Sequence, residues 1–154
     1  MTATADLYDL HGDALQSLAL QLRSFGGIAE FEGPIRTVRC YQDNARVKQI
    51  LQTPGEGAVL IVDGAGSLET ALMGDLIAKS AVDAGWAGVI IHGCVRDSVA
   101  LGRMPLGVKA LGTNPRKSAK EGTGETDVPV EIDGVVFRPG ARAYADEDGI
   151  LVER

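Results

Sequence analysis

Two unbroken apolar runs stand out along the chain, at residues 58–62 and 87–91. Both begin with alanine and are otherwise made of branched aliphatic residues and one glycine, Gly88, and neither contains a charged side chain. A strand that is covered on both faces has no polar face, so continuous apolar character indicates a strand inside a parallel sheet. The sequence therefore predicts two buried, parallel strands.

The segment between these runs has the periodicity of a helix. It opens at Gly74-Asp75, its apolar residues recur at helical spacing up to Ala84, and Gly85 is a typical stop signal. A strand, a helix and a second parallel strand form a βαβ unit. We expect this unit to be the core of the fold.

Shorter patterns predict further elements on either side. Beyond Asp97 the chain is punctuated by turn signals such as Asp133-Gly134 and is interpreted as β hairpins, while residues 113–127 are the best candidate for a long functional loop. The apolar residues of 17–22 are expected to pack near the first helix. Two further helices are predicted, one at residues 4–10, capped by Thr4, and one that begins at Asp43-Asn44 and ends at residues 53–55. The remaining predicted elements are strands at residues 35–40, 106–110, 128–132, 135–137 and 150–152.

Composition supports a single α/β domain over residues 1–154, with a parallel βαβ core and a β-rich second half. The chain has 154 residues, of which 45% are hydrophobic, enough to bury one core. Its 20 glycines and only 5% aromatic residues indicate tight turns and a core of small aliphatic side chains.

Charge and hydropathy exclude several partners. A net charge of −6 would repel a phosphate backbone or an anionic membrane surface, so direct binding to nucleic acid or membranes is not expected. The apolar runs are too short to span a bilayer, and the acidic first residues do not resemble a signal peptide, which predicts a cytoplasmic protein. Cys40 and Cys94 have no partner at metal or redox spacing and are interpreted as buried small residues.

The βαβ unit also predicts a cleft. The start of its helix, at Gly74-Asp75, and the loop after its second strand, with Arg96-Asp97, must both lie at the carboxyl edge of the sheet. Helix N–H groups, a guanidinium and two carboxylates can together bind a small anion, such as an α-keto acid, and a hard metal ion. The alternative is structural, because Asp75 can simply cap its helix and Arg96-Asp97 can form a solvated loop pair.

The same residues resemble a known signature. Gly74-Asp75, twenty intervening residues and Arg96-Asp97 are similar to the motif of the regulator of ribonuclease activity A (RraA) and 4-hydroxy-4-methyl-2-oxoglutarate aldolase family. The resemblance covers nearly the whole chain. Its further matches are Phe25-Gly26-Gly27, Thr37-Val38-Arg39-Cys40, Asp43-Asn44, Val62-Asp63-Gly64-Ala65-Gly66-Ser67, Leu111-Gly112-Thr113-Asn114-Pro115 and Tyr144-Ala145-Asp146.

The resemblance implies a swivelling β/β/α fold, a ring-shaped homotrimer and a lyase that forms pyruvate by oxaloacetate decarboxylation or aldol cleavage. Arg96 would bind the carboxylate and ketone of a keto-acid substrate. Asp97 would ligate a divalent cation, for which Mg or Mn suits a carboxylate-and-water site. Asp75 would assist proton transfer, so Asp75, Arg96 and Asp97 are the predicted catalytic residues. The predicted substrate-binding set is Gly74, Asp75, Leu76, Ile77 and Arg96.

Two departures bear on this assignment. Aldolase members carry an acidic residue three positions after the motif aspartate, where this chain has Ala100, so decarboxylation is favoured over aldol cleavage. The chain also ends at Arg154, whereas longer aldolase relatives add a carboxylate from a neighbouring subunit's C-terminal region. The alternative function from the same family is a non-catalytic regulator that binds and inhibits an RNA-degrading endonuclease.

Other signals were weighed against simpler explanations. Gly64-Ala65-Gly66 lacks the third glycine of a dinucleotide loop, so a turn is preferred, and the methyltransferase label given to some relatives is rejected for want of a nucleotide-cofactor domain. His92 is interpreted as a structural residue near the cleft rather than a proton relay. Trp86 is expected in the core or at a subunit contact. A solvated loop surface is the preferred interpretation of four basic residues, and a basic rim around the cleft is the alternative; these residues are Lys109, Arg116, Lys117 and Lys120.

Overall fold

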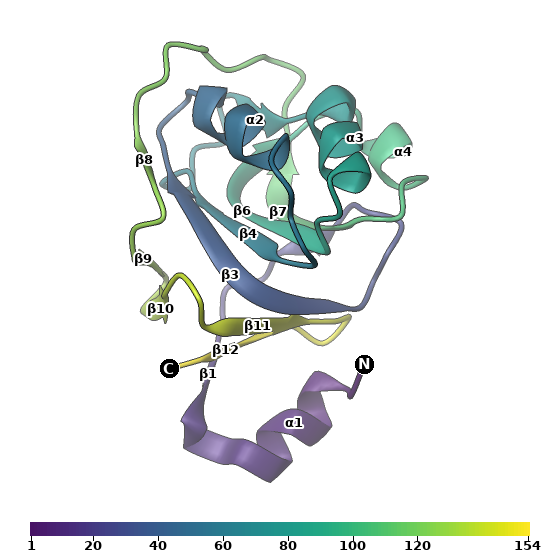
Figure 1. Cartoon of the computed structure of the whole chain (residues 1–154), viewed down its shortest axis with the longest axis vertical. Coiled ribbons are helices and arrows are strands. Elements are labelled where there is room, and N and C mark those ends of the chain that lie inside the picture. The colour runs from purple at the N-terminus through teal and green to yellow at the C-terminus, as the bar shows by residue number, and fades with distance from the viewer.

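Four parallel strands form the centre of the molecule and end at one common edge (Figure 1). The computed structural model describes all residues from 1 to 154. The strands lie side by side in the order β3 (Phe31–Arg39), β4 (Val59–Asp63), β6 (Gly88–Val95) and β7 (Gly107–Thr113). Val59 of β4 lies opposite Gly88 of β6 in parallel register, which confirms the predicted βαβ unit.

Short helices connect these strands and cover one face of the sheet (Figure 1). They are α2 (Ala45–Leu51), α3 (Asp75–Asp83) and α4 (Ser98–Leu101). The helices and the sheet enclose a core of 22 buried residues, including Trp86, whose indole N–H donates to the Thr53 carbonyl at 3.0 Å. Trp86 is therefore a core residue.

Strand β3 belongs to two layers of the fold. Its second half pairs in parallel with β4, whereas its first half pairs in antiparallel fashion with β11 (Arg142–Ala145). A side chain at Gly33 would place its Cβ 2.1 Å from the Gly57 carbonyl oxygen, so only glycine fits where the strand passes from one layer to the other.

The second β layer packs against the other face of the parallel sheet and encloses a core of 14 buried residues. The predicted hairpin at Asp133-Gly134 is confirmed, since both turn residues have positive φ, as a tight hairpin turn requires. One interpretation was wrong, because residues 106–110 belong to the parallel strand β7 rather than to a hairpin. Strand β11 was not predicted. The remaining strands of this layer are β1 (Leu15–Ser17), β9 (Val130–Ile132), β10 (Val135–Phe137) and β12 (Ile150–Glu153).

The N-terminal helix α1 (Thr4–His11) and the following 3-10 turn (Gly12–Ala14) lie beneath the second layer. Thr4 is not the helix cap, which is Ala3; instead the Thr4 N–H and hydroxyl both donate to the Asp146 carboxylate, at 2.8 and 2.7 Å. No helix of the molecule has the length and apolar character needed to cross a membrane. The remaining short strands are β2 (Arg23–Ser24), β5 (Ala71–Met73) and β8 (Glu125–Thr126).

Candidate functional site

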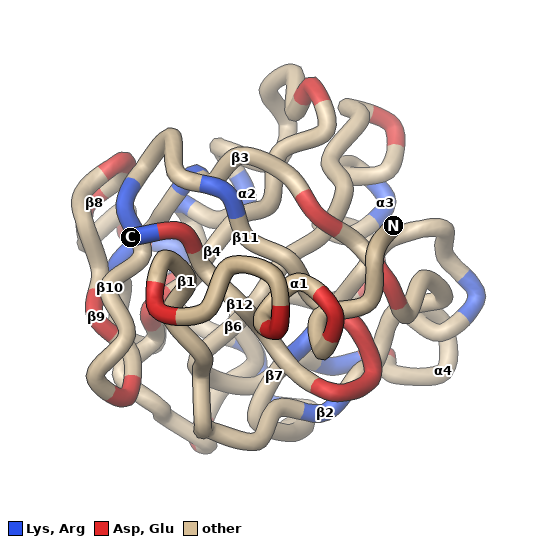
Figure 2. The backbone as a smooth tube through the Cα atoms, turned by 90° about the horizontal axis from the view of Figure 1, so that it is seen from below, with Lys and Arg blue, Asp and Glu red and all other residues tan.

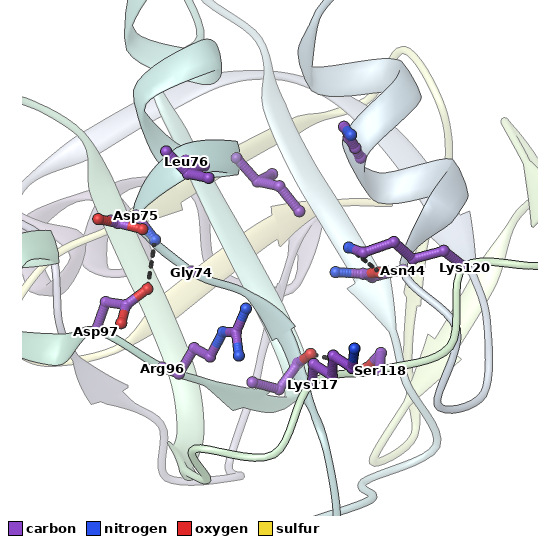
Figure 3. A pocket seen from close by; sticks show the side chains of 12 residues that line it. Asn44, Gly74, Asp75, Leu76, Arg96, Asp97, Lys117, Ser118 and Lys120 are labelled. Carbon is purple, nitrogen blue, oxygen red and sulfur yellow. Dashed lines mark hydrogen bonds between the residues drawn. The ribbon is translucent and has the colours of Figure 1, made fainter.

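A cavity of about 230 Å³ opens at the carboxyl edge of the parallel sheet. Its walls are the N-terminal ends of α2 and α3, the residues that follow β6, and part of the loop between β7 and β8. Figure 3 shows two carboxylates at one end, Arg96 in the middle and lysines at the other end. The lining residues are Asn44, Lys48, Ala71, Gly74, Asp75, Leu76, Ile77, Arg96, Asp97, Lys117, Ser118 and Lys120.

The carboxylate end is built by a close approach of two loops. The Asp75 backbone N–H donates to Asp97 Oδ2 at 3.0 Å (Figure 3). Asp97 has a φ of 58°, a left-handed conformation that aspartate tolerates better than most residues. A Cβ on Gly74 would lie 2.6 Å from Asp97 Oδ2 and 3.2 Å from Arg96 Cγ. Glycine is therefore required for both side chains to occupy their positions.

Arg96 directly follows β6, and its backbone N–H donates to the Met73 carbonyl at 3.0 Å, which fixes the root of the side chain. The guanidinium makes one long contact, from Nη1 to the Pro115 carbonyl at 3.4 Å. Its remaining N–H donors are free for a ligand, and the planar group suits the paired oxygens of a carboxylate or an α-keto acid.

The opposite end of the pocket is basic. Lys48, Lys117 and Lys120 join Arg96, so four cationic side chains line a cavity that contains two carboxylates. This local charge contrasts with the net charge of −6, and Figure 2 shows acidic residues on α1 and nearby loops, at the far end of the molecule from α2 and α3. The pocket is thus suited to an anionic ligand.

All residues predicted for the site line this pocket, but two of them do not offer their side chains to a ligand. Leu76 is 83% exposed at the rim, and the side chain of Ile77 is buried in the core. What they offer a ligand is their backbone N–H groups in the first turn of α3, where a helix leaves such donors without intrahelical partners.

Two of the four basic residues of the alternative rim line the pocket. Lys117 and Lys120 line it, whereas Arg116 does not and Lys109 is buried beside Glu147 and Asp148 on the other side of the sheet, where burial lowers its pKa. Sequence reasoning did not assign four of the lining residues to the site: Asn44, Lys48, Ala71 and Ser118. The matching of Asp43-Asn44 to the family pattern was the one signal that pointed to this wall.

His92 does not line the pocket. It lies within β6, which extends beyond the predicted run at residues 87–91 to Val95. Its Nδ1 is buried without a hydrogen bond, 3.8 Å from Asp63 Oδ1. The nearby turn at residues 64–66 leads into strand β5 rather than into a helix. A dinucleotide loop needs a helix start at that point, so the turn interpretation is the correct one.

Both cysteines are buried thiols, as predicted. Cys40 is 5% exposed, and burial, followed by the charges of Asp43 and Asp63, raises the pKa of its thiol to about 12. The thiolate needed for metal binding or nucleophilic attack is therefore disfavoured at Cys40.

A family model described as RraA-like, Aldolase/RraA, matches residues 4–152 of the chain. The chain belongs to the RraA-like family. This confirms the resemblance seen in the sequence and agrees with the mixed α/β architecture of a large sheet with few helices. The family includes both metal-dependent aldolases and ribonuclease inhibitors.

Three solved structures are similar to this chain. One from Geobacillus kaustophilus, described as an S-adenosylmethionine: 2-dimethylmenaquinone methyltransferase, is 51% identical, with a TM-score of 0.97 over 99% of this chain and 94% of that chain. The RNA-processing inhibitor RraA from Thermus thermophilus is 48% identical, with a TM-score of 0.96 over 99% and 93% of the two chains. An unusual member of the RNase ES inhibitor RraA family from Streptomyces coelicolor is 27% identical, with a TM-score of 0.76 over 96% and 76%.

The donor set of the RraA-like pocket fits a hard divalent cation. No three His, Cys, Asp or Glu side chains converge anywhere in the structure, so the chain does not build an all-protein metal cage. Asp97 uses Oδ2 for the Asp75 N–H, which leaves Oδ1 available beside a pocket large enough for water and substrate oxygens. One carboxylate completed by waters and substrate is typical of Mg and Mn rather than of zinc.

Proposed function

We propose that this protein is a divalent-metal-dependent lyase that forms pyruvate from a keto acid of the oxaloacetate type. The observation that carries the proposal is the contact of the Asp97 carboxylate with the start of α3, next to a largely unpaired Arg96. This arrangement offers a cation ligand and a carboxylate-binding group side by side. Membership in a family that contains metal-dependent aldolases supports the same function.

Different residues along the pocket bind the substrate, hold the cation and deliver the proton. Arg96 and the N–H groups at the start of α3 bind and orient the α-keto carboxylate. Asp97 would hold the cation, and a bound cation supplies Lewis-acid stabilisation of the negative charge that develops on the ketone oxygen. Loss of CO₂ from oxaloacetate leaves its electron pair in the enolate of pyruvate, and a proton delivered from the Asp75 side of the pocket completes the product.

Decarboxylation is proposed over aldol cleavage. Aldol cleavage needs a base to take the proton of the substrate hydroxyl, whereas decarboxylation does not. Ala100 lies on α4, and its methyl group cannot act as acid or base. The prediction from the sequence is therefore retained as part of the proposal.

A trimer in the cytoplasm is proposed as the working form. The pocket is open to solvent, and two large apolar side chains lie exposed close to it, Leu76 at 83% and Val99 at 70%. Contact with another subunit would bury both side chains and would close the edge of the pocket.

The experiment that tests the enzyme is pyruvate release from oxaloacetate, measured with Mg, with Mn and with EDTA. Free metal ions decarboxylate oxaloacetate on their own, so each rate is compared with the same buffer without protein. We expect turnover above this background that is lost with EDTA and restored by Mg or Mn. Rates equal to the background with both metals would disprove the proposal.

The second candidate is a non-catalytic regulator that inhibits an RNA-degrading endonuclease by direct contact. It is favoured by the 48% identity to the RNA-processing inhibitor from Thermus thermophilus. Asp97→Asn separates the two functions, because inhibition by surface contact does not need the charge of a pocket carboxylate. If the wild-type protein and Asp97→Asn both inhibit an endoribonuclease and neither releases pyruvate, the regulator is favoured over the lyase.

A further inference from the structure

Asp43 makes far more contacts than a helix cap requires. Its carboxylate is 2% exposed, and Oδ1 accepts the Ala45 N–H at the start of α2 at 3.0 Å. The backbone N–H groups of Glu121, Gly122 and Thr123 also converge on this carboxylate, with donor distances to Oδ2 of 3.0, 3.1 and 3.3 Å. The Thr123 hydroxyl donates to Oδ2 as well, at 3.1 Å.

These contacts favour an ionised carboxylate, because every group that faces Asp43 in them is a donor. Burial alone would raise the pKa of the Asp43 carboxyl, but the hydrogen bonds from Ala45, Thr123 and Gly122 hold it below its ordinary value. Three successive N–H groups directed at one point form an anion-binding nest. In this protein the nest is occupied by the chain's own Asp43, which ties the loop after Lys120 to the start of α2.

Asn44 continues the connection into the pocket. Its Oδ1 accepts a hydrogen bond from Lys120 Nζ at 3.3 Å (Figure 3). Its Nδ2 donates to the Leu72 carbonyl at 3.2 Å. Leu72 lies on β5, two residues before Gly74, so Asn44 touches both walls of the cavity. Lys120 is thus held by Asn44 through its ammonium and by Asp43 through its backbone neighbours.

We propose that Asp43 and Asn44 are positioning residues that hold Lys120 at the basic end of the pocket, where Lys120 binds the second carboxylate of a four-carbon dicarboxylic acid. The choice of substrate class rests on the proposed lyase function. The lysine end lies across the pocket from the Asp97 end, with Arg96 between them (Figure 3). A diacid whose keto-acid end lies at Arg96 and Asp97 therefore places its other carboxylate toward Lys120.

A matched pair of unreactive ligands tests this subsite. L-Malate and L-lactate share the 2-hydroxy carboxylate end, and only malate carries the second carboxylate. Calorimetric titration with Mg present should give tighter binding of malate than of lactate to the wild-type protein. Lys120→Met should weaken malate binding about tenfold, the scale of one charge-assisted hydrogen bond, and leave lactate binding within about twofold.

Asp43→Asn tests the positioning role. The amide replaces one carboxylate oxygen of Asp43 by an NH₂ group, which cannot accept hydrogen bonds from the nest. The loop after Lys120 therefore loses its attachment to the start of α2, while the Lys120 side chain itself is unchanged. We expect a loss for malate similar to that of Lys120→Met, and no additional loss when Asp43→Asn is introduced into the Lys120→Met background. If Asp43 had only a structural role, Asp43→Asn would weaken the binding of malate and lactate alike, or its effect would add to that of Lys120→Met. Either result overturns the inference.

Two variants with the same change of charge serve as controls. Lys79→Met alters an exposed lysine of α3 and Asp133→Asn alters an exposed turn, and neither residue lines the pocket. Should Asp43→Asn fail to fold, Asn44→Ala removes the acceptor of Lys120 without opening the nest and must show the same malate-specific loss. Unchanged malate binding in Asn44→Ala or in Lys120→Met refutes the proposal.

The outcome is separable from that of the lyase itself. Selective malate binding that depends on Lys120, in a protein that releases no pyruvate from oxaloacetate, would refute the proposed function and leave the diacid subsite standing. If the protein releases pyruvate from oxaloacetate but its malate affinity is unchanged by substitution of Lys120 or Asp43, the diacid subsite alone is refuted.

Discussion

Gly74 lies against the Asp97 carboxylate and the Arg96 side chain, with no room for a side chain of its own. Gly74→Ala should therefore displace Asp97 and lower metal-dependent turnover at least about tenfold, because a misplacement of about 1 Å is enough to cost that much or more. The fold should tolerate the change, since Asp97 is exposed and can move.

Steady-state turnover on oxaloacetate and thermal unfolding check this prediction. Gly112→Ala is the matched control, because a Cβ at Gly112 meets no atom within 4 Å. Wild-type turnover in Gly74→Ala would show that the position of the Asp97 carboxylate does not matter for catalysis.

Asp97→Asn and Arg96→Lys test the proposed catalytic pair. The amide keeps the shape and the left-handed backbone of Asp97 but loses the charge that would hold a hard cation, and an ammonium lacks the two-pronged geometry of Arg96. Each change should lower turnover about 100-fold or more, roughly 3 kcal/mol of transition-state stabilisation. The double variant should be little worse than either single one, because both act on one site. Near-wild-type rates above the free-metal background in both single variants would rule out the assigned site.

The sequence predicted these pocket residues because they are close to the ends of one βαβ unit, whose geometry is local. It missed Lys48, and it interpreted Asp43-Asn44 as a cap and as a match to the family pattern without giving either residue a role in the pocket. That role depends on Lys120 and Glu121, more than seventy positions away. Contacts of that range are set by the tertiary fold and leave no periodic signal.

At the scale of elements, prediction succeeded where a strand is long and buried. The parallel strands β4 and β6 were recognised from continuous apolar runs. Strands β5 and β11 have three and four residues, and their pairing partners rather than their own sequence determine them. The first half of β3 was also missed, since Gly33 and Pro34 are ordinarily strand breakers.

Helix α1 provides an element with a pH-dependent anchor. Burial would raise the pKa of the Asp146 carboxyl, but the hydrogen bonds from Thr4, Asp148 and Gly149 lower it overall. A lowered folded-state pKa stabilises the protein above the unfolded value of about 3.9, and this contribution is lost as the pH falls through the folded pKa. Asp146→Asn should therefore cost about 1–3 kcal/mol at pH 7 and progressively less in acid.

Urea unfolding of the wild type and of Asp146→Asn, repeated between pH 7 and pH 3, measures this difference. Asp133→Asn, in an exposed turn, should follow the wild type throughout. A difference in the free energy of unfolding that stays constant over this range would mean that the charge of Asp146 is not what anchors α1.

At the scale of the whole molecule, the open pocket beside exposed Leu76 and Val99 leads us to expect a trimer. Light scattering at micromolar concentration should give three times the chain mass of 16.1 kDa. Leu76→Lys and Val99→Lys together should weaken assembly, because each places an ammonium in the apolar contact. A monomer in the wild-type protein would contradict the proposed assembly.

The sharing of β3 between the two layers has a mechanical consequence. Its backbone is hydrogen-bonded on one side to the parallel sheet and continues without a break into the antiparallel layer, so neither core can open while the other keeps this strand in place. The two cores should therefore melt in a single cooperative transition, and the calorimetric enthalpy of the molecule should equal its van't Hoff enthalpy. Gly33→Val, which crowds the point where the layers meet, should lower the melting temperature of both cores together. Two resolved heat-absorption peaks would mean that the layers unfold as separate bodies.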